Sequence, residues 1–393
     1  MPIVPSRRVQ RVRPSPTLAL TVLVNRLRAE GRNIIGLGIG EPDFDTPAPI
    51  AAAGIAAIRS GRTRYTNVDG TPELKDAIIA KFLRENRLEY ARDQVLVSSG
   101  AKQTIFNLCL ALLDAGDEVI IPAPYWVSYP DMVLLADAEP VIVPAGPEQA
   151  YKITPLQLEA AITPRTRLLL LNSPSNPTGA AYSRTELMAL GKVLERHPRV
   201  VIGTDDIYEH IWWGTEPFCS LAEACPNLHE RTVTINGVSK GYAMTGWRIG
   251  FCGGPRELVA AMTTIQGQST SNPSSISQAA AVAALLGDQE SVRRMNLAFK
   301  ERHDFVVGAL NELPGVSCLP GQGTFYAFAD IRRCLAHRGM NSDTDMATHL
   351  LETAGVALVP GSAFGAPGHL RLSFASNLET LREAIQRIGR AIG

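Results

Sequence analysis

Residues 232–253 of this chain read TVTINGVSKGYAMTGWRIGFCG. The runs Thr232–Ile235 and Ile249–Gly253 predict two strands, because both are short, apolar and bounded by turn residues. Lys240 lies in the loop that leaves the first of them. An isolated lysine among apolar residues is usually a surface side chain with a buried stem. In open α/β sheets, however, ligands bind outside the carboxyl ends of the strands, so this loop is a candidate site.

Strand-like runs and helical patterns alternate from about Pro47 to Gly287. The other predicted strands are Gln94–Ser98, Glu118–Pro122, Pro140–Pro144, Arg167–Leu171 and Val200–Thr204. The helix candidates include Thr17–Gly31, Gln103–Asp114, Thr154–Ala161 and Ser183–His197. Several of the strands are nearly continuous apolar segments, which is typical of strands covered by helices on both faces. We therefore predict an α/β fold on a large, mostly parallel sheet of about seven strands.

The pattern changes beyond Gly287. A long helix candidate is followed by three strand-like segments and a last helix, at Glu290–Leu313, Phe325–Ala329, Val356–Val359, His369–Phe374 and from Leu378. This mixture is typical of a small α+β domain. We predict an N-terminal arm and part of the small domain at 1–46, a large domain at 47–287 and a small C-terminal domain at 288–393.

The composition argues against several classes of protein. The 393 residues carry 38 Lys and Arg against 38 Asp and Glu, so no basic excess points to a nucleic-acid partner. No apolar run approaches the roughly 20 residues of a membrane-spanning helix, and Met1–Pro16 lacks the apolar core of a secretory signal. The six cysteines form no Cys-x-x-Cys pair, which favours the cytoplasm over a zinc ribbon or a disulfide framework. The seven histidines show no metal-ligand spacing, so we predict no metal site.

Three further loops follow predicted strands or precede helices. Residues 172–179 read NSPSNPTG, residues 205–208 read DDIY, and residues 98–103 read SSGAKQ. Taken singly, the first is a structural turn, and an acid in the second is a helix cap. The third offers N–H groups to an anion at a helix start, but such turns are common without one. Their occurrence together, in this order, is far more specific than any one of them.

Together these loops resemble those of the class I/II aminotransferases of fold type I, which depend on pyridoxal 5′-phosphate (PLP). The pattern Ser-Lys-x5-Gly-x-Arg-x-Gly, from Ser239 to Gly250, and the Asn-Pro-Thr-Gly element carry the resemblance. It continues along the chain in Gly40-Glu41-Pro42-Asp43-Phe44, Arg64-Tyr65, Pro124-Tyr125-Trp126 and Leu370-Arg371-Leu372-Ser373. The resemblance implies a transaminase that works by a ping-pong mechanism through PLP and pyridoxamine phosphate.

The resemblance also implies roles for the catalytic residues. Lys240 would bind PLP covalently and then carry protons, as a desolvated lysine beside cations can. Asp205 would pair with the pyridine nitrogen and keep it protonated, so that the ring accepts electrons from the substrate Cα. Tyr208 would donate to the phenolic oxygen of the cofactor, helped by the amide of Asn176.

Further residues would hold the cofactor and the substrate. The resemblance assigns the phosphate to Gly100, Ala101, Lys102, Ser239 and Arg248. Trp126 would stack on the pyridine ring, although a lone tryptophan more often packs in a core. Tyr65 resembles the tyrosine that reaches the cofactor of the neighbouring subunit, which implies a homodimer with shared sites.

Arg371 would clamp the substrate α-carboxylate through two hydrogen bonds, and Gly38 matches a mobile, glycine-rich segment that covers the substrate. One position departs from the family pattern. Many members carry a hydroxyl residue two positions before the Ser-Lys pair, where this chain has Gly237. We expect one hydrogen bond to the phosphate to be missing there.

Four segments, Pro14–Thr17, Ser99–Gln103, Pro124–Tyr129 and Ala243–Trp247, look closest to the bacterial, non-enteric aspartate/prephenate aminotransferases. In that subgroup the counterparts of Lys102 and Thr17 contact the distal carboxylate of a dicarboxylic substrate. The resemblance therefore implies transfer of the amino group of aspartate, or of a related amino acid, to 2-oxoglutarate. A lysine is a point charge, so it should tolerate more substrate shapes than an arginine fork.

Three alternatives remain open at this stage. The enzyme could be a prephenate or broad aromatic aminotransferase, or a PLP-dependent C–S β-lyase, because the same cofactor residues serve each reaction. A non-catalytic regulator with this fold would carry a DNA-binding domain before it, for which Met1–Gly36 is too short.

Overall fold

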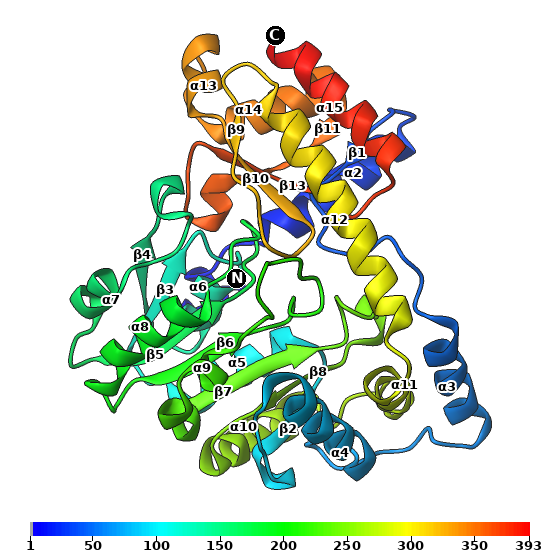
Figure 1. The fold of residues 1–393 in the computed structure, drawn as a ribbon, viewed down its shortest axis with the longest axis vertical. Coiled ribbons are helices and arrows are strands. Elements are labelled where there is room, and N and C mark those ends of the chain that lie inside the picture. The colour runs from blue at the N-terminus through cyan, green and yellow to red at the C-terminus, as the bar shows by residue number, and fades with distance from the viewer. Residues whose placement is uncertain (1–2) are drawn as a thin grey trace.

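The computed structural model describes residues 3–393, and a seven-stranded sheet forms the centre of its larger part (Figure 1). In spatial order its strands are β2 (Val95–Ser98), β8 (Gly250–Gly253), β7 (Thr232–Gly237), β6 (Val201–Asp205), β5 (Thr166–Asn172), β3 (Glu118–Ala123) and β4 (Glu139–Pro144). β8 is antiparallel to both neighbours, and the other pairs are parallel. The predicted mostly parallel sheet is confirmed, and each predicted strand lies within two residues of its expected ends.

Alternate residues of the inner strands face two apolar layers, one on each side of the sheet. On β3, Val119 and Ile121 pack into one layer and Ile120 into the other, and all three are fully buried. The first layer includes α5 (Ala101–Leu112), α6 (Tyr129–Leu135) and α10 (Arg256–Ser269). The second includes α7 (Pro155–Ala161), α8 (Arg184–Glu195) and α9 (Leu221–Ala224). This two-sided burial explains why the strands read as apolar runs without alternation.

Three more helices pack together beside β2, namely α3 (Ala48–Arg59), α4 (Pro72–Lys81) and α11 (Ser275–Leu286). A π-helical turn, Phe82–Asn86, extends α4. The short α1 (Arg7–Gln10) lies against α6, where Arg11 bonds Glu139 at 2.9 Å.

The upper part of Figure 1 contains a four-stranded antiparallel sheet in the order β12 (Val359–Pro360), β13 (His369–Ser373), β10 (Tyr326–Asp330) and β9 (Ser317–Cys318). Its helices are α12 (Glu290–Asn311), α13 (Arg332–Arg338), α14 (Asp343–His349) and α15 (Leu378–Ile392). α12 runs from beside α11 up to α15 (Figure 1). Near the N-terminus, α2 (Pro16–Ala29) and β1 (Ile35–Gly36) join this part, and β1 pairs in parallel with β11 (Val356–Ala357).

Two predicted elements need correction. The single strand expected over 356–359 is two strands, because β11 pairs with β1 whereas β12 pairs with β13. The helix expected from Gln103 begins two residues earlier, at Ala101, because Gly100 turns the chain with a positive φ of 89°. The domain limits at 46 and 287 stay a prediction. Within residues 3–393, no helix is both long and apolar enough to cross a membrane.

Candidate active site

A cavity of about 380 Å³ lies at the carboxyl ends of β5, β6 and β7, under β10 and β13. The predicted site residues that line it are Thr17, Ala101, Lys102, Trp126, Asn176, Asp205, Tyr208, Ser239, Lys240, Arg248 and Arg371. Three others do not line it: Gly38, Tyr65 and Gly100. The structure thus brings together most of the residues that the sequence singled out, at the edge where open α/β sheets bind ligands.

Lys240 lies three residues beyond β7, and its Nζ donates to the backbone oxygen of Gly40 at 2.6 Å. Burial, and next the charge of Arg248, lower the pKa of Lys240 to about 8. About a tenth of this amine is therefore unprotonated at pH 7, far more than for an ordinary lysine. Such an amine can attack a carbonyl and can accept a proton.

Asp205 ends β6 and is buried. The hydroxyl of Tyr129 donates to Asp205 Oδ2 at 2.6 Å, and the backbone N–H of Ile207 donates to Oδ1 at 3.3 Å. Burial raises the pKa of Asp205 to about 6, although the bond from Tyr129 opposes the rise. A buried carboxylate of this kind gains most from a cationic partner in the cavity.

Tyr208 follows Asp205 by three residues in a tight turn, and its hydroxyl lies 2.9 Å from that of Tyr326 on β10. Burial, and next the neighbouring Tyr326, raise the pKa of Tyr208 well above its ordinary value. Tyr208 is therefore a neutral phenol that can donate a hydrogen bond into the cavity.

Arg371, on β13, is 2% exposed. It donates from Nη1 to Asn176 Oδ1 at 2.8 Å and from Nη2 to the backbone oxygen of Gly38 at 2.5 Å. Its guanidinium stacks over the rings of Tyr326 and Phe364, 4.4 and 4.9 Å from their centres. No carboxylate of the described residues pairs with it. A buried, planar cation without an acidic partner suits the carboxylate of a ligand.

The start of α5 forms the floor of the cavity. Ala101 and Lys102 occupy the first turn, where backbone N–H groups have no partner within the helix. Gly100 brings the chain into this turn, and a Cβ on Gly250 would collide with the backbone of Gly100 and Ala101. Ser239 and Arg248 line the same end. These groups could hold an anion in the way that helix N-termini do.

Lys102 and Thr17 also line the cavity with their side chains. The Lys102 Nζ lies 4.9 Å from the centre of the Trp126 ring, and partial burial, followed by Arg248, lowers the pKa of Lys102. Thr17 is half-buried at the start of α2, with its Oγ1 3.0 Å from Ser15 Oγ.

Two residues that shape the site were given no role from the sequence: Tyr129, which bonds Asp205, and Tyr326, which bonds Tyr208. Tyr129 begins α6, three residues after Trp126, so its position was a usable signal. Tyr326 comes from the other sheet, and its contact depends on a fold-level juxtaposition that no local pattern reveals. The departure at Gly237 has a steric reason, because a Cβ there would come within 2.9 Å of the oxygen of Ile249, the residue just before the paired strand β8.

Comparison with known proteins identifies the family. A family model described as "Aminotransferase class I and II" matches residues 32–388. The chain belongs to this family. Class I and II aminotransferases depend on pyridoxal 5′-phosphate, so this protein is a PLP-dependent transaminase.

Individual relatives of this aminotransferase cover nearly its whole length. An "Aspartate/prephenate aminotransferase" of Nitrosomonas europaea is 57% identical over 389 residues, 98% of each chain. The crystal structure of the aspartate aminotransferase from Rhizobium meliloti superposes with a TM-score of 0.96 at 48% identity, over 100% of this chain and 99% of that one. The aspartate aminotransferase from Thermus thermophilus with maleate has a TM-score of 0.93 at 41% identity, over 99% and 100% of the two chains.

The cavity of this aminotransferase fits PLP on its own chemistry. PLP needs an amine for its aldehyde, an acid for its ring nitrogen and donors for a phosphate dianion. The cavity offers the amine of Lys240, the buried acid of Asp205 and the open helix start with Arg248. The pKa shifts of Lys240 and Asp205 match these demands. Burial favours the neutral form of both side chains, and a bound partner would change that form.

Proposed function

We propose that this aminotransferase moves the amino group of aspartate to 2-oxoglutarate, with Lys240, Asp205 and Tyr208 as its catalytic residues. The observation that carries the proposal is one cavity in which an amine with a lowered pKa, a buried acid and an acid-free arginine face one another. When bound, PLP supplies an electron-accepting ring that stabilises negative charge at the substrate Cα.

Each of these residues has its own role in the reaction. Lys240 would take the proton from the substrate Cα and deliver it to the cofactor carbon that had borne the aldehyde, because its amine has a pKa of about 8. Asp205 holds a proton on the ring nitrogen, and Tyr129 keeps the carboxylate oriented through its 2.6 Å bond. Tyr208 donates to the phenolic oxygen of the cofactor, and Asn176 contributes through its amide.

Binding is assigned to the surrounding groups. The cofactor phosphate is held by Ala101, Lys102, Ser239 and Arg248, with Gly100 shaping the turn that leads into α5, and the face of the ring by Trp126. Arg371 binds the substrate α-carboxylate, and Asn176 and Gly38 accept its two existing hydrogen bonds and so fix its plane. The segment that follows Gly38 reaches the cavity, since Ile39, Gly40 and Glu41 line it.

A dicarboxylic substrate is supported by two observations. Lys102 and Thr17 line the same cavity as Arg371, so a second carboxylate would find a cation there. The Thermus thermophilus relative is described with maleate, itself a dicarboxylate. Prephenate is a second candidate, favoured by the name of the Nitrosomonas europaea relative. The relatives' names favour transamination over β-elimination.

Replacing Lys102 by glutamine tests the choice of substrate. We expect kcat/KM for aspartate and glutamate to fall roughly 10- to 100-fold, because a charged hydrogen bond to the distal carboxylate is lost. The rate with tyrosine and alanine, which lack a second carboxylate, should change little. The measurement is single-turnover loss of the visible cofactor band on mixing the PLP form with each donor. If all donors slow equally, Lys102 serves the phosphate alone and the proposed selectivity is wrong.

We also propose a homodimer in the cytoplasm whose subunits share their sites. Tyr65 is 92% exposed in the single chain, and Ile55 and Ile58 on the nearby α3 are about half exposed. The six buried, free thiols suit a reducing compartment.

Subunit mixing tests the shared site. Tyr65→Phe and Lys240→Ala homodimers are each expected to be impaired, the first mildly and the second almost completely. Mixed dimers would contain one site with both native residues, so activity should exceed the sum of the separate preparations. Light scattering gives the oligomeric state. A fully active monomer, or a lack of any gain on mixing, would contradict the shared site.

A further inference from the structure

A buried polar cluster, formed by Lys81, Glu85, Asn86, Glu209 and His210, lies behind the cavity and does not line it. Lys81 is fully buried at the end of α4, and its Nζ pairs with the Glu209 carboxylate and donates to Asn86 Oδ1 at 2.7 Å. Asn86 Nδ2 donates to Glu209 Oε2 at 2.8 Å. Three side chains therefore form a closed ring of polar contacts in the protein interior.

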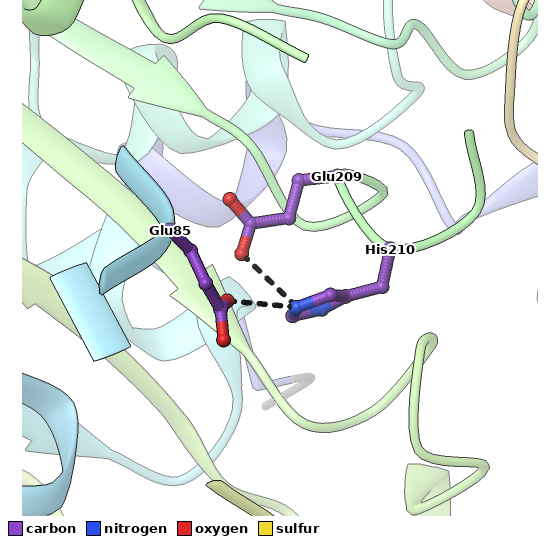
Figure 2. A group of neighbouring side chains, drawn as sticks. All are labelled: Glu85, Glu209 and His210. Atoms are coloured by element: carbon purple, nitrogen blue, oxygen red, sulfur yellow. Dashed lines mark hydrogen bonds and ion pairs between the residues drawn. The ribbon is translucent and has the colours of Figure 1, made fainter. Parts of the chain in front are cut away.

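Glu85 and His210 are the partly exposed members of this cluster, and Figure 2 shows them with Glu209. The His210 Nε2 lies 2.9 Å from Glu85 Oε2 and 3.6 Å from Glu209 Oε1. Carboxylate and imidazole atoms this close could ligate a metal ion. However, the Lys81 ammonium lies 3.6 Å from Glu85 and contacts Glu209 directly. The positive charge of the cluster is thus already provided by the chain, so we do not assign a metal site.

The cluster holds one end of the turn that begins at Asp205. Asp205, Tyr208 and Glu209 lie within five residues, and the backbone N–H of Glu209 donates to the Asp206 oxygen at 3.0 Å. The Ile211 N–H donates to the Tyr208 oxygen at 2.8 Å. Since Glu209 is fixed by Lys81 and Asn86, the backbone on both sides of Tyr208 is fixed as well.

The same cluster contacts the loop that carries Lys240. The rings of His210 and Tyr242 meet edge to face, 5.2 Å apart. A Cβ on Gly241 would come within 2.7 Å of the His210 Cβ, so the two loops pack backbone to side chain. His210 thus stands between Glu85 on one side and the Lys240 loop on the other.

A contribution to stability alone does not explain why this cluster is buried against the Tyr208 turn and the Lys240 loop. A buried ion pair is often no better for stability than apolar side chains of similar size. Asp206, also buried, adds a further acid, and its burial, followed by the charge of Glu209, raises its pKa. Because burying these charges costs desolvation energy, we explain the cluster by the two loops that it holds in place.

We propose that the cluster is a positioning device, in which the Lys81–Glu209 pair and its Asn86 and His210 contacts hold the Asp205–Tyr208 turn and the Lys240 loop in fixed relation. The inference rests on the proposed roles of Asp205, Tyr208 and Lys240. Lys81, Asn86, Glu209 and His210 touch neither substrate nor cofactor, and act through the residues that do.

Glu209→Gln tests the device in the holoenzyme. The amide keeps the size of the side chain and can still accept from Asn86, but the charge that faces Lys81 is lost. We expect kcat to fall roughly 10- to 100-fold, as it does for partners that orient functional ligands. The visible circular dichroism of bound PLP should change as well, because it reports the orientation of the ring. Glu118→Gln is the matched control, since Glu118 is buried and ion-paired at the amino end of β3, the opposite edge of the sheet.

A double variant separates positioning from stability. Lys81→Met/Glu209→Met removes both charges, so no ion is left unpaired, and thermal stability should recover toward that of the parent. We expect kcat and the visible dichroism to remain altered, because the contact with Asn86 is gone. If kcat and the visible dichroism recover together with thermal stability, the inference is wrong. It is also wrong if the Glu209→Gln enzyme has the same kcat and dichroism as the Glu118→Gln enzyme. Parent enzyme that fails to transaminate aspartate would instead refute the proposed function.

Discussion

Lys240→Ala is expected to abolish covalent attachment of PLP and nearly all transamination. Positioned proton transfer alone contributes roughly 10²- to 10⁴-fold to a rate, and this variant loses the covalent attachment as well. The other lysine that lines the cavity is Lys102, whose Nζ lies 4.9 Å from the centre of the Trp126 ring. The measurements are the visible absorbance of the PLP-treated protein, the mass of the chain after borohydride reduction, and the steady-state rate with aspartate and 2-oxoglutarate.

Lys102→Met is the matched control for this loss. It removes an amine from the same cavity with a similar stem, and should leave the borohydride-reducible link intact. A pH series adds a second check, because the pKa of Lys240 is about 8 in the cofactor-free protein. The rate of attachment should rise with pH through about 8 and level off above it, since the neutral amine attacks. A Lys240→Ala protein that still holds PLP covalently would refute the assignment of Lys240.

The sequence predicted the large sheet well because its strands are buried on both faces. A strand such as β5 has no polar alternation to blur its limits, and glycines and prolines bound it. The short strands were harder. β11 and β12 are two residues each, and which neighbour they pair with is decided by the distant segment Ile35–Gly36 rather than by their own residues.

The site was predictable where neighbouring residues carry the chemistry. Lys240 with Ser239, and Asp205 with Tyr208, lie in loops that the strand pattern brings to one edge. The contacts that tune them come from elsewhere in the chain. Arg371 reaches Asn176 across 195 residues, and Tyr326 meets Tyr208 across 118. Such pairs depend on how the two sheets meet, and the burial that shifts the pKa of Asp205 depends on the whole fold.

Asp205→Asn is expected to slow transamination roughly 30- to 5,000-fold. Removing one partner of a buried charge pair costs about 2–5 kcal/mol, and the amide cannot keep the ring nitrogen protonated. PLP should still attach to Lys240, so the defect lies in kcat more than in attachment. Tyr129→Phe is the companion variant: it keeps the carboxylate but removes the 2.6 Å bond, and should cost roughly 10- to 100-fold. A fully active Asp205→Asn enzyme would exclude an ionic role for this residue.

Asp205→Asn, which is expected to slow the reaction, should stabilise the cofactor-free protein. The pKa of Asp205 is raised from 3.8 to about 6, so the folded protein binds this proton more tightly than the unfolded chain does. The stability that this proton confers is complete below about pH 4 and lost as the pH rises through 6, a change of about 3 kcal/mol. The amide carries no charge, so the Asp205→Asn variant should unfold at higher urea than the parent at pH 8 and at equal urea at pH 4. With PLP bound, the parent should be more stable to urea than the variant, because the carboxylate then has its cationic partner. If the cofactor-free variant is instead less stable than the parent at pH 8, the Asp205 carboxylate has a stabilising partner within the chain. Its burial would then not depend on the ring nitrogen for compensation.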